Sequence, residues 1–302
     1  MTSLERSLRR SMRWLAVPLL GATLVGCSDG DPTGSGGEGT VSFTTWGEEY
    51  IEDEIPPDPE GQRGFIDGWR VKYDFFLVNF ANIIVADQKG VVAATMPGGK
   101  VFDNHVPGVK SILDFSDLPA KAYSQVSYEI VPPTEDGEVG PDVDAARRQE
   151  MVDNGYSVYV QATATRDEET RTFTWGFPIS TRYTDCHSEQ NGRDEMGVVV
   201  TNNATLEAQL TTHGDHLFYD RLQASPDPSI ATSLRFDAIA AAAGDDHDVT
   251  LEELDGVSLA TLVGTYDRSG FPARTLGEFV TSLARTVGHF RGEGECTTQD
   301  SF

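Results

Sequence analysis

The chain has 302 residues, of which 48 are Asp or Glu and 23 are Lys or Arg, so its formal net charge is −25. This acidic balance argues against nucleic acid as a partner, because phosphate binding needs a basic surface. It also argues against electrostatic docking onto anionic lipid. The charge suits an exported protein that must stay soluble, or carboxylates that converge on a divalent cation.

Residues 1–26 have the organisation of a secretory signal peptide. Four arginines precede an apolar run from Trp14 to Val25, which is shorter than the roughly 20 residues that a membrane-spanning helix needs. The segment Leu24-Val25-Gly26-Cys27 resembles the lipobox of bacterial lipoproteins, in which the cysteine is lipidated and becomes the new N-terminus. The alternative is an ordinary signal peptide with an incidental cysteine.

The lipobox predicts a protein anchored in the cell envelope by a lipid on Cys27. Residues 27–40 are Gly-rich and polar, so they are predicted to form a flexible tether. Ser28 directly after Cys27 favours the outer membrane of a Gram-negative bacterium, by analogy with well-studied lipoproteins. The expected partners are the membrane, reached through the lipid, and an envelope protein.

Residues 41–213 are predicted to form a β-sandwich. The strongest strand signal runs from Trp69 to Ala86, where apolar residues first alternate with polar ones and then occupy both faces. Its length predicts a bend or bulge near residues 79–82. Further strands are predicted at 41–46, 90–95, 100–102, 124–131, 156–166, 170–183 and 197–212, with a short helix at 143–152.

Residues 214–302 are predicted to form a helical C-terminal subdomain, because the apolar period changes from His216 onward. Helices are expected at 216–222, 233–243, 251–263 and 276–290, the last opened by a Thr275-x-x-Glu278 capping box. The predicted fold is therefore mainly β, a sandwich of about seven to nine strands with a helical appendage: an EF-hand-like helix–loop–helix followed by a terminal helix.

Two cysteines, Cys186 and Cys296, follow the lipobox. An exported compartment permits disulfides, and two thiols allow one pairing. We predict a Cys186–Cys296 bridge, for which the chain-entropy model gives roughly 4–5 kcal/mol of stabilisation. Two free thiols or two metal ligands are the alternatives.

The segment His213-Gly214-Asp215-His216 is the most suggestive cluster for chemistry. Two imidazoles and a carboxylate within four residues are a plausible ligand set for Zn²⁺ or Cu²⁺. The structural alternative is a strand end at His213, a turn at Gly214 and a helix N-cap at Asp215. The His-Glu-x-x-His signature of zinc proteases is absent.

Residues 242–253 resemble the twelve-residue calcium loop of an EF-hand. Asp246, Asp248 and Glu253 occupy the fifth, seventh and twelfth positions. Ala242 replaces the first aspartate and His247 the turn glycine, which removes features that tight Ca²⁺ binding needs. We interpret the loop as a structural remnant, in which Thr250 and Glu253 form a capping box, with weak Ca²⁺ binding as the alternative.

Two other groups of residues are candidates for a functional site. An acidic, aromatic patch consists of Glu48, Glu49 and Glu52 beside Trp46 and Tyr50. Such a patch suits a metal or sugar site, although a solvated first helical turn is the favoured interpretation. His289 is predicted to be an isolated histidine near a helix C-terminus, where the dipole stabilises it. Signatures of nucleophilic, phosphate-binding and dinucleotide-binding enzymes are absent.

Several segments together, among them WGEEYIEDEIP, DGWRVKYDFFLV, HGDHLFYD and GHFRGEGEC, look like those of uncharacterised cell-envelope lipoproteins of myxobacteria and their relatives. This resemblance spans nearly the whole mature chain and implies no activity. The order of the predicted strands is similar to that of periplasmic β-sandwich metal-binding proteins, a topological likeness.

The leading functional hypothesis is a non-enzymatic, lipid-anchored envelope protein that binds a ligand, plausibly a divalent metal such as Zn²⁺, Cu²⁺ or Ca²⁺, through His213, Asp215 and His216. The second hypothesis is a structural or protein-interaction module without a metal site. The third is a metal-dependent hydrolase that uses the same histidines, which requires an open coordination position and a nearby carboxylate base.

Overall fold

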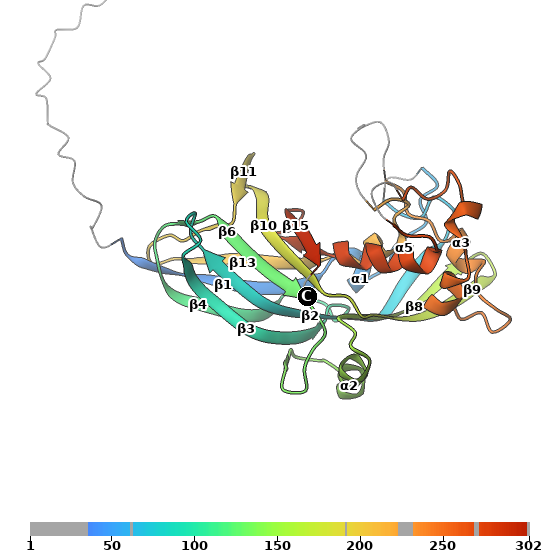
Figure 1. Ribbon diagram of the computed structural model, residues 1–302, viewed down its shortest axis with the longest axis horizontal. Coiled ribbons are helices and arrows are strands. Elements are labelled where there is room, and N and C mark those ends of the chain that lie inside the picture. The colour runs from blue at the N-terminus through green and yellow to red at the C-terminus, as the bar shows by residue number, and fades with distance from the viewer. Residues whose placement is uncertain (1–35, 61–62, 191, 223–231, 269–271, 301–302) are drawn as a thin grey trace, which may run out of the picture. The chain divides into compact units, whose positions relative to one another are not determined.

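The computed structural model describes residues 36–60, 63–190, 192–222, 232–268 and 272–300 (Figure 1). The predicted signal peptide, Cys27 and the tether up to Ser35 lie outside the described residues. Residues 36–302 form one compact unit. Within the described part, no helix has the length and apolarity that crossing a membrane requires.

The fold is mainly β, as predicted, with its strands in several sheets in a sandwich-like arrangement (Figure 1). One sheet has the order β14 (Gly288–Phe290), β13 (Thr205–Thr212), β1 (Glu38–Gly47) and β4 (Lys110–Pro119). The path of the larger sheet is β11 (Arg193–Met196), β10 (Thr181–Gln190), β6 (Gln125–Ile130), β2 (Arg70–Ala86), β3 (Val92–Asp103) and β7 (Glu138–Val139).

Further strands extend these sheets. β8 (Val158–Arg166) pairs with β2 and with β9 (Glu169–Phe177), and β15 (Glu295–Asp300) pairs with β10. β5 (Ala122–Tyr123) and β12 (Val198–Val199) form a small separate ladder. The predicted single strand at 170–183 is two strands, β9 and β10, because Pro178 between them lacks the N–H that a continued ladder needs.

β2 runs through the centre of the larger sheet. Its first half pairs with β8, and its second half with β3 and β6. The register shifts between Ala81 and Ile83, and Asn82 has a φ of 49°. The bulge predicted near residues 79–82 is therefore confirmed, and it bends a strand that is too long to stay regular.

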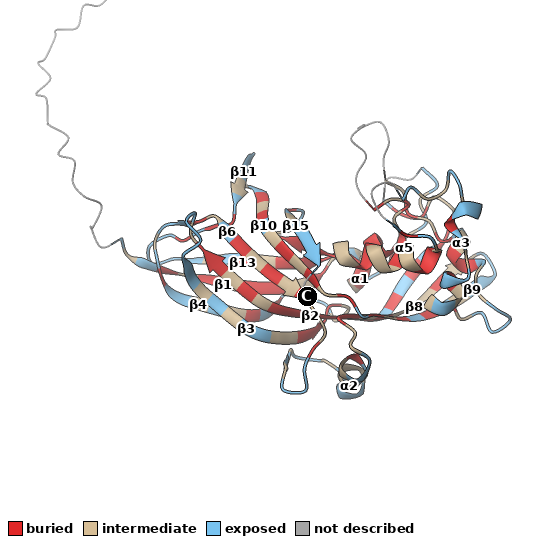
Figure 2. Cartoon of the chain, in the orientation of Figure 1, coloured by how far each residue is buried: buried red, intermediate tan, exposed pale blue. Residues whose placement is uncertain are grey.

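The larger of two hydrophobic core clusters in the described chain joins the strands of both sheets to the C-terminal segments. Along β10, buried residues alternate with less buried ones (Figure 2), as expected for strands that have one face toward a core. Phe173 and Trp175 stack with ring centroids 4.1 Å apart. Both pack near Phe218, and Phe173 also packs near Phe236, from beyond residue 213. Residues on either side of position 213 thus share one core.

The helices are short. They are α1 (Glu49–Glu52), α2 (Ala145–Asn154), α3 (Asp237–Ala240), α4 (Leu251–Asp255) and α5 (Leu276–Leu283), with 3₁₀ turns η1 (Asp215–Phe218), η2 (Leu259–Thr261) and η3 (Ala284–Thr286). α2 lies close to the predicted range. Asp144 caps it by accepting a hydrogen bond from the Arg147 N–H, and Gly155 ends it with a φ of 68°.

The C-terminal region is less helical than predicted. Thr275 caps α5 by accepting a hydrogen bond from the Glu278 N–H, but the Glu278 carboxylate accepts from the Arg274 N–H, so the predicted capping box is only half formed. The helix ends at Leu283 instead of continuing to residue 290. Residues 288–290 and 295–300 are strands instead, because β13 and β10 offer them free edges for backbone hydrogen bonds. The ranges 216–222 and 251–263 contain only the short elements η1, α4 and η2.

The structure contains the predicted Cys186–Cys296 disulfide. Cys186 is fully buried on β10, and Cys296 lies on β15, which pairs with β10. The bridge therefore fastens the C-terminal strand to the larger sheet across a sequence separation of 110 residues.

Candidate metal centre

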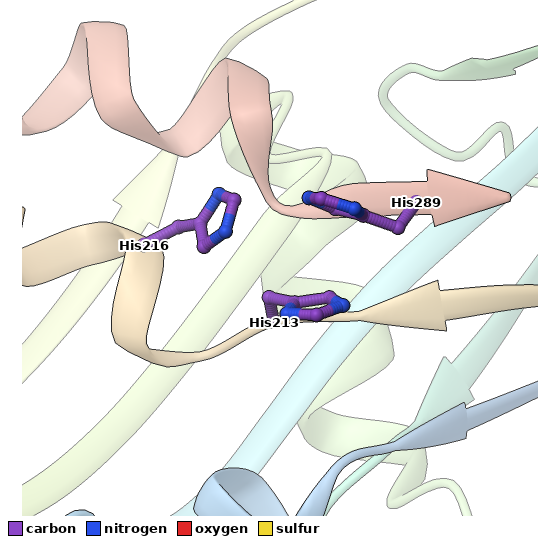
Figure 3. A group of neighbouring side chains, drawn as sticks. All are labelled: His213, His216 and His289. Carbon is purple, nitrogen blue, oxygen red and sulfur yellow. The ribbon is translucent and has the colours of Figure 1, made fainter. Parts of the chain in front are cut away.

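Three histidines, His213, His216 and His289, form a buried cluster where β13, η1 and β14 meet (Figure 3). We call these residues the histidine cluster. The ring centroids of His213 and His289 are 4.1 Å apart, and those of His216 lie 5.2 Å from His213 and 4.9 Å from His289. Figure 3 shows the three rings facing a common space.

Strand pairing brings His213 and His289 together. In the ladder between β13 and β14, Thr211 is opposite His289, so their side chains lie on one face of the sheet. His213 follows Thr211 by two residues and continues that face. The His213 N–H also donates a hydrogen bond to the Val287 carbonyl, 2.8 Å away, which keeps the end of β13 beside the start of β14.

A tight turn at Gly214 positions His216. A Cβ at Gly214 would lie 2.6 Å from Ile51 and 2.8 Å from Tyr73, so the turn can pack against the core only without a side chain. The Tyr73 hydroxyl donates a hydrogen bond to the Gly214 carbonyl at 2.7 Å. η1 then begins, and one turn separates His216 from His213.

Hydrogen bonds determine which nitrogen of His216 carries a proton. The Thr286 hydroxyl donates to the Leu283 carbonyl at 2.8 Å, so its oxygen is left to accept a hydrogen bond. His216 Nδ1 lies 3.0 Å from that oxygen and therefore carries the proton. Nε2 keeps its lone pair, as in metal-binding histidines whose other nitrogen donates to a protein oxygen.

The other two histidines also have unused ring nitrogens. His289 Nδ1 is buried and has no hydrogen-bond partner among the described residues. His213 Nε2 lies 3.0 Å from Glu48 Oε1, but no described group is aligned with it as in a hydrogen bond. Buried polar atoms normally have partners, so these nitrogens are available to bind a ligand.

Burial keeps two of the imidazoles neutral. It lowers the pKa of His216 well below its usual value, assisted by the neighbouring His289 and His213. Burial, with the charge of His213, lowers the pKa of His289 to about 3. Burial also opposes a proton on His213, but the contact with Glu48 and nearby carboxylate charges outweigh it and raise the pKa of that ring.

The nitrogens can form a metal-ligand set. One nitrogen from each ring lies within 4.8 Å of the others. Zn–N bonds of about 2.0–2.1 Å separate tetrahedral ligands by about 3.4 Å, so the nitrogens need to approach one another by at most about 1.4 Å around an ion. Three imidazoles with a vacant fourth position suit Zn²⁺ or Cu²⁺ better than Ca²⁺, which prefers oxygen ligands.

Asp215 is not brought into the histidine cluster, although the sequence predicts it as a ligand. Its carboxylate is buried and accepts a hydrogen bond from the Tyr219 hydroxyl at 3.0 Å. Burial raises the pKa of Asp215. Neither three-residue group with metal-binding spacing among the described residues contains it. His289 takes the third position instead.

A cleft of about 690 Å³ adjoins the histidine cluster. Its lining includes the three histidines, Glu48, Glu293 and Cys296. The cluster is therefore accessible from this cleft, with carboxylates at its side.

In the predicted calcium loop, the carboxylates accept hydrogen bonds from other groups of the chain. Glu253 accepts hydrogen bonds from the N–H groups of Gly244 and Thr250, at 3.1 and 2.9 Å, and forms the predicted capping box. Asp248 accepts from the Thr172 hydroxyl at 2.7 Å, and Asp246 from the Asp248 N–H at 3.2 Å. The loop is flanked by α3 and α4, of four and five residues.

The prediction that His289 is an isolated histidine at a helix end is wrong. The structure places it on β14, buried in the cluster. Glu48, favoured as part of a solvated helical turn, is half-buried and contacts His213. A signal for His289 would have required the pairing of residues 288–290 with β13, which local periodicity does not contain.

Comparison with known proteins assigns no family: no protein-family model and no curated protein matches the chain. Among solved structures, MbnP from Methylosinus trichosporium is similar at 12% sequence identity and a TM-score of 0.26, over 60% of this chain and 76% of that one. A similarity of this size establishes neither the fold nor the function of the chain.

Proposed function

We propose that the protein binds one transition metal ion, Zn²⁺ or Cu²⁺, through His213, His216 and His289. The observation that carries this proposal is the convergence of three buried imidazoles whose nitrogens lie within 4.8 Å of one another. Two of the rings are neutral at physiological pH, and ligand histidines must be neutral. The protein acts in this proposal by binding the ion and not by catalysis.

We also propose that the protein works in the cell envelope, anchored by a lipid on Cys27 and in contact with an envelope partner. The Cys186–Cys296 disulfide supports export, because such bonds persist in oxidising compartments. Expression of the full chain and of Cys27→Ala tests the anchor. The wild type is expected in the membrane fraction and the variant in the soluble fraction; equal distribution of the two contradicts lipidation.

Metal content tests the binding proposal. We expect the purified protein, residues 28–302, to hold one equivalent of Zn²⁺ or Cu²⁺ by elemental mass spectrometry after loading and desalting. His216→Ala/His289→Ala removes two ligands and should hold none, whereas His187→Ala, which changes a histidine paired with Asp194 outside the cluster, should match the wild type.

Thermal unfolding gives a second readout. A ligand that binds only the native state at 100 times its Kd stabilises it by about 2.7 kcal/mol, so saturating Zn²⁺ should raise the Tm of the wild type and leave that of His216→Ala/His289→Ala unchanged. If the wild type holds no metal and its Tm does not respond, the protein-interaction hypothesis replaces metal binding.

A further inference from the structure

A second group of potential ligands lies beside the histidine cluster. Glu48, His213 and Glu293 each place one ligand atom within 4.8 Å of the other two. Glu48 precedes α1 at the end of β1, and Glu293 lies between β14 and β15. Glu48 and Glu293 are 245 positions apart in the chain. They lie close together because β1 and β14 flank β13 in the sheet.

The carboxylates of Glu48 and Glu293 are not held by capping hydrogen bonds or by basic side chains other than His213 in the described chain. Glu48 is at the N-cap position of α1, yet its side chain makes no capping hydrogen bond. Among the described residues, neither Glu48 nor Glu293 forms an ion pair with a lysine or arginine. The basic group beside them is His213, whose Nε2 lies 3.0 Å from Glu48 Oε1. One imidazole does not offset two carboxylates that repel each other, so a divalent cation between them stabilises their proximity.

His213 provides an independent observation. Its side chain is 5% exposed, and its Nε2, 3.0 Å from Glu48 Oε1, has no aligned hydrogen-bond partner in the described part of the chain. The same histidine belongs to both ligand groups. Both groups also line the same cleft.

Exposure of the ligands increases away from the histidine cluster. His216 and His289 are buried, Glu48 is half-buried and Glu293 is exposed. Carboxylate oxygens with one imidazole accept a broad range of divalent ions, including Mn²⁺, whereas three imidazoles favour Zn²⁺ and Cu²⁺. A hydrated ion entering the cleft therefore meets the carboxylates before it meets the buried rings.

We infer that Glu48, His213 and Glu293 form an outer cation subsite, through which a divalent metal ion reaches the histidine cluster. The ion keeps His213 as a ligand while His216 and His289 replace the two carboxylates. Because His213 is shared, one ion occupies either subsite but not both. This inference rests on the proposed function for its inner site only.

Rates of metal exchange test the route. In Glu48→Gln/Glu293→Gln, we expect both association and dissociation of Zn²⁺, followed by stopped flow with a competing chromophoric chelator, to slow about tenfold, with Kd within about threefold of the wild type. Glu138→Gln/Glu168→Gln removes the same charge from exposed positions outside the cleft and should leave both rates unchanged. Slower association with unchanged dissociation would show only long-range attraction and overturn the route.

Equilibrium binding of Mn²⁺ tests the outer subsite without the inner one. In His216→Ala/His289→Ala, loss of the free Mn²⁺ signal in electron paramagnetic resonance should reveal one weak site, which is absent when Glu48→Gln/Glu293→Gln is added. Circular dichroism checks that each variant is folded. Equal Mn²⁺ binding with and without the two carboxylates overturns the subsite, while a wild type that binds Mn²⁺ but neither Zn²⁺ nor Cu²⁺ overturns the proposed function alone.

Discussion

The histidine cluster and the acidic loop at residues 242–253 contain residue types that bind metals, but they differ in what their polar atoms contact. In the loop, Glu253 and Asp248 accept hydrogen bonds from the chain itself. In the cluster, His289 Nδ1 and His213 Nε2 are buried without aligned partners among the described residues. A metal site needs ligand atoms that the fold leaves unsatisfied, and only the cluster has them.

The two regions also differ in how they are built. The loop is closed by local contacts, chiefly the Thr250–Glu253 capping box, within a few residues. The cluster depends on the pairing of β13 with β14, which brings His213, just after β13, close to His289 on β14. These two histidines are more than 70 residues apart in the sequence. A local sequence motif can therefore resemble a metal site and yet have only a structural role. Conversely, residues that are distant in the sequence can form a candidate site that has no sequence motif.

The largest expected effect separates the two regions by metal binding. Replacing the loop carboxylates in Asp246→Asn/Asp248→Asn/Glu253→Gln should leave Zn²⁺ affinity unchanged, whereas His216→Ala/His289→Ala should weaken it by at least about 100-fold, since loss of a supporting residue alone costs 10–100-fold. Isothermal titration calorimetry measures both. Loss of Zn²⁺ binding in the loop variant would contradict the conclusion that the loop has no part in the metal site.

A smaller effect on affinity is expected from the residue that orients His216. Thr286→Val keeps the side-chain shape but removes the oxygen that accepts the Nδ1 hydrogen bond, so Zn²⁺ affinity should fall by about tenfold. Thr286→Ser retains the hydroxyl and serves as the control. If the valine and serine variants bind Zn²⁺ equally well, the hydrogen bond does not orient the ring.

The loop should respond in stability and not in metal binding. Thr250→Ala removes the cap of α4 and is expected to lower the free energy of unfolding by about 1 kcal/mol, measured by urea denaturation. Addition of Ca²⁺ or of a chelator should not change the stability of either protein. A Ca²⁺-dependent rise in stability that Asp246→Asn abolishes would reveal a calcium site.

The smallest effect is a pH dependence of the capping box. Hydrogen bonds from Thr250 and Gly244 lower the pKa of Glu253 below its ordinary value of 4.5. Its contribution to stability is therefore present above the unfolded pKa and is lost as pH falls through the folded pKa. The stability difference between the wild type and Glu253→Gln, measured by urea denaturation, should shrink between pH 6 and pH 3. A difference that does not change over this range would contradict the role of the carboxylate in the capping box.

Much of the β structure could be predicted because alternation is a local property. The long strand β2, its bulge near Asn82 and the strand pair β8 and β9 follow from side-chain periodicity and turn residues. β4 is absent from the predicted elements. The end of the predicted helix at 276–290 is wrong at residues 288–290, which form β14, because backbone pairing with β13 prevails over helical spacing there.

The sequence by itself determined the β-rich class, the Cys186–Cys296 pairing, the Thr250 capping box and the proximity of His213 to His216, because each depends on composition or on neighbours along the chain. Tertiary structure alone decided that His289 completes the cluster and that Asp215 is not part of it. It also brought Glu48 and Glu293 to His213. Strand order and register set these contacts, and they arise from non-local backbone hydrogen bonds and burial that no local pattern encodes.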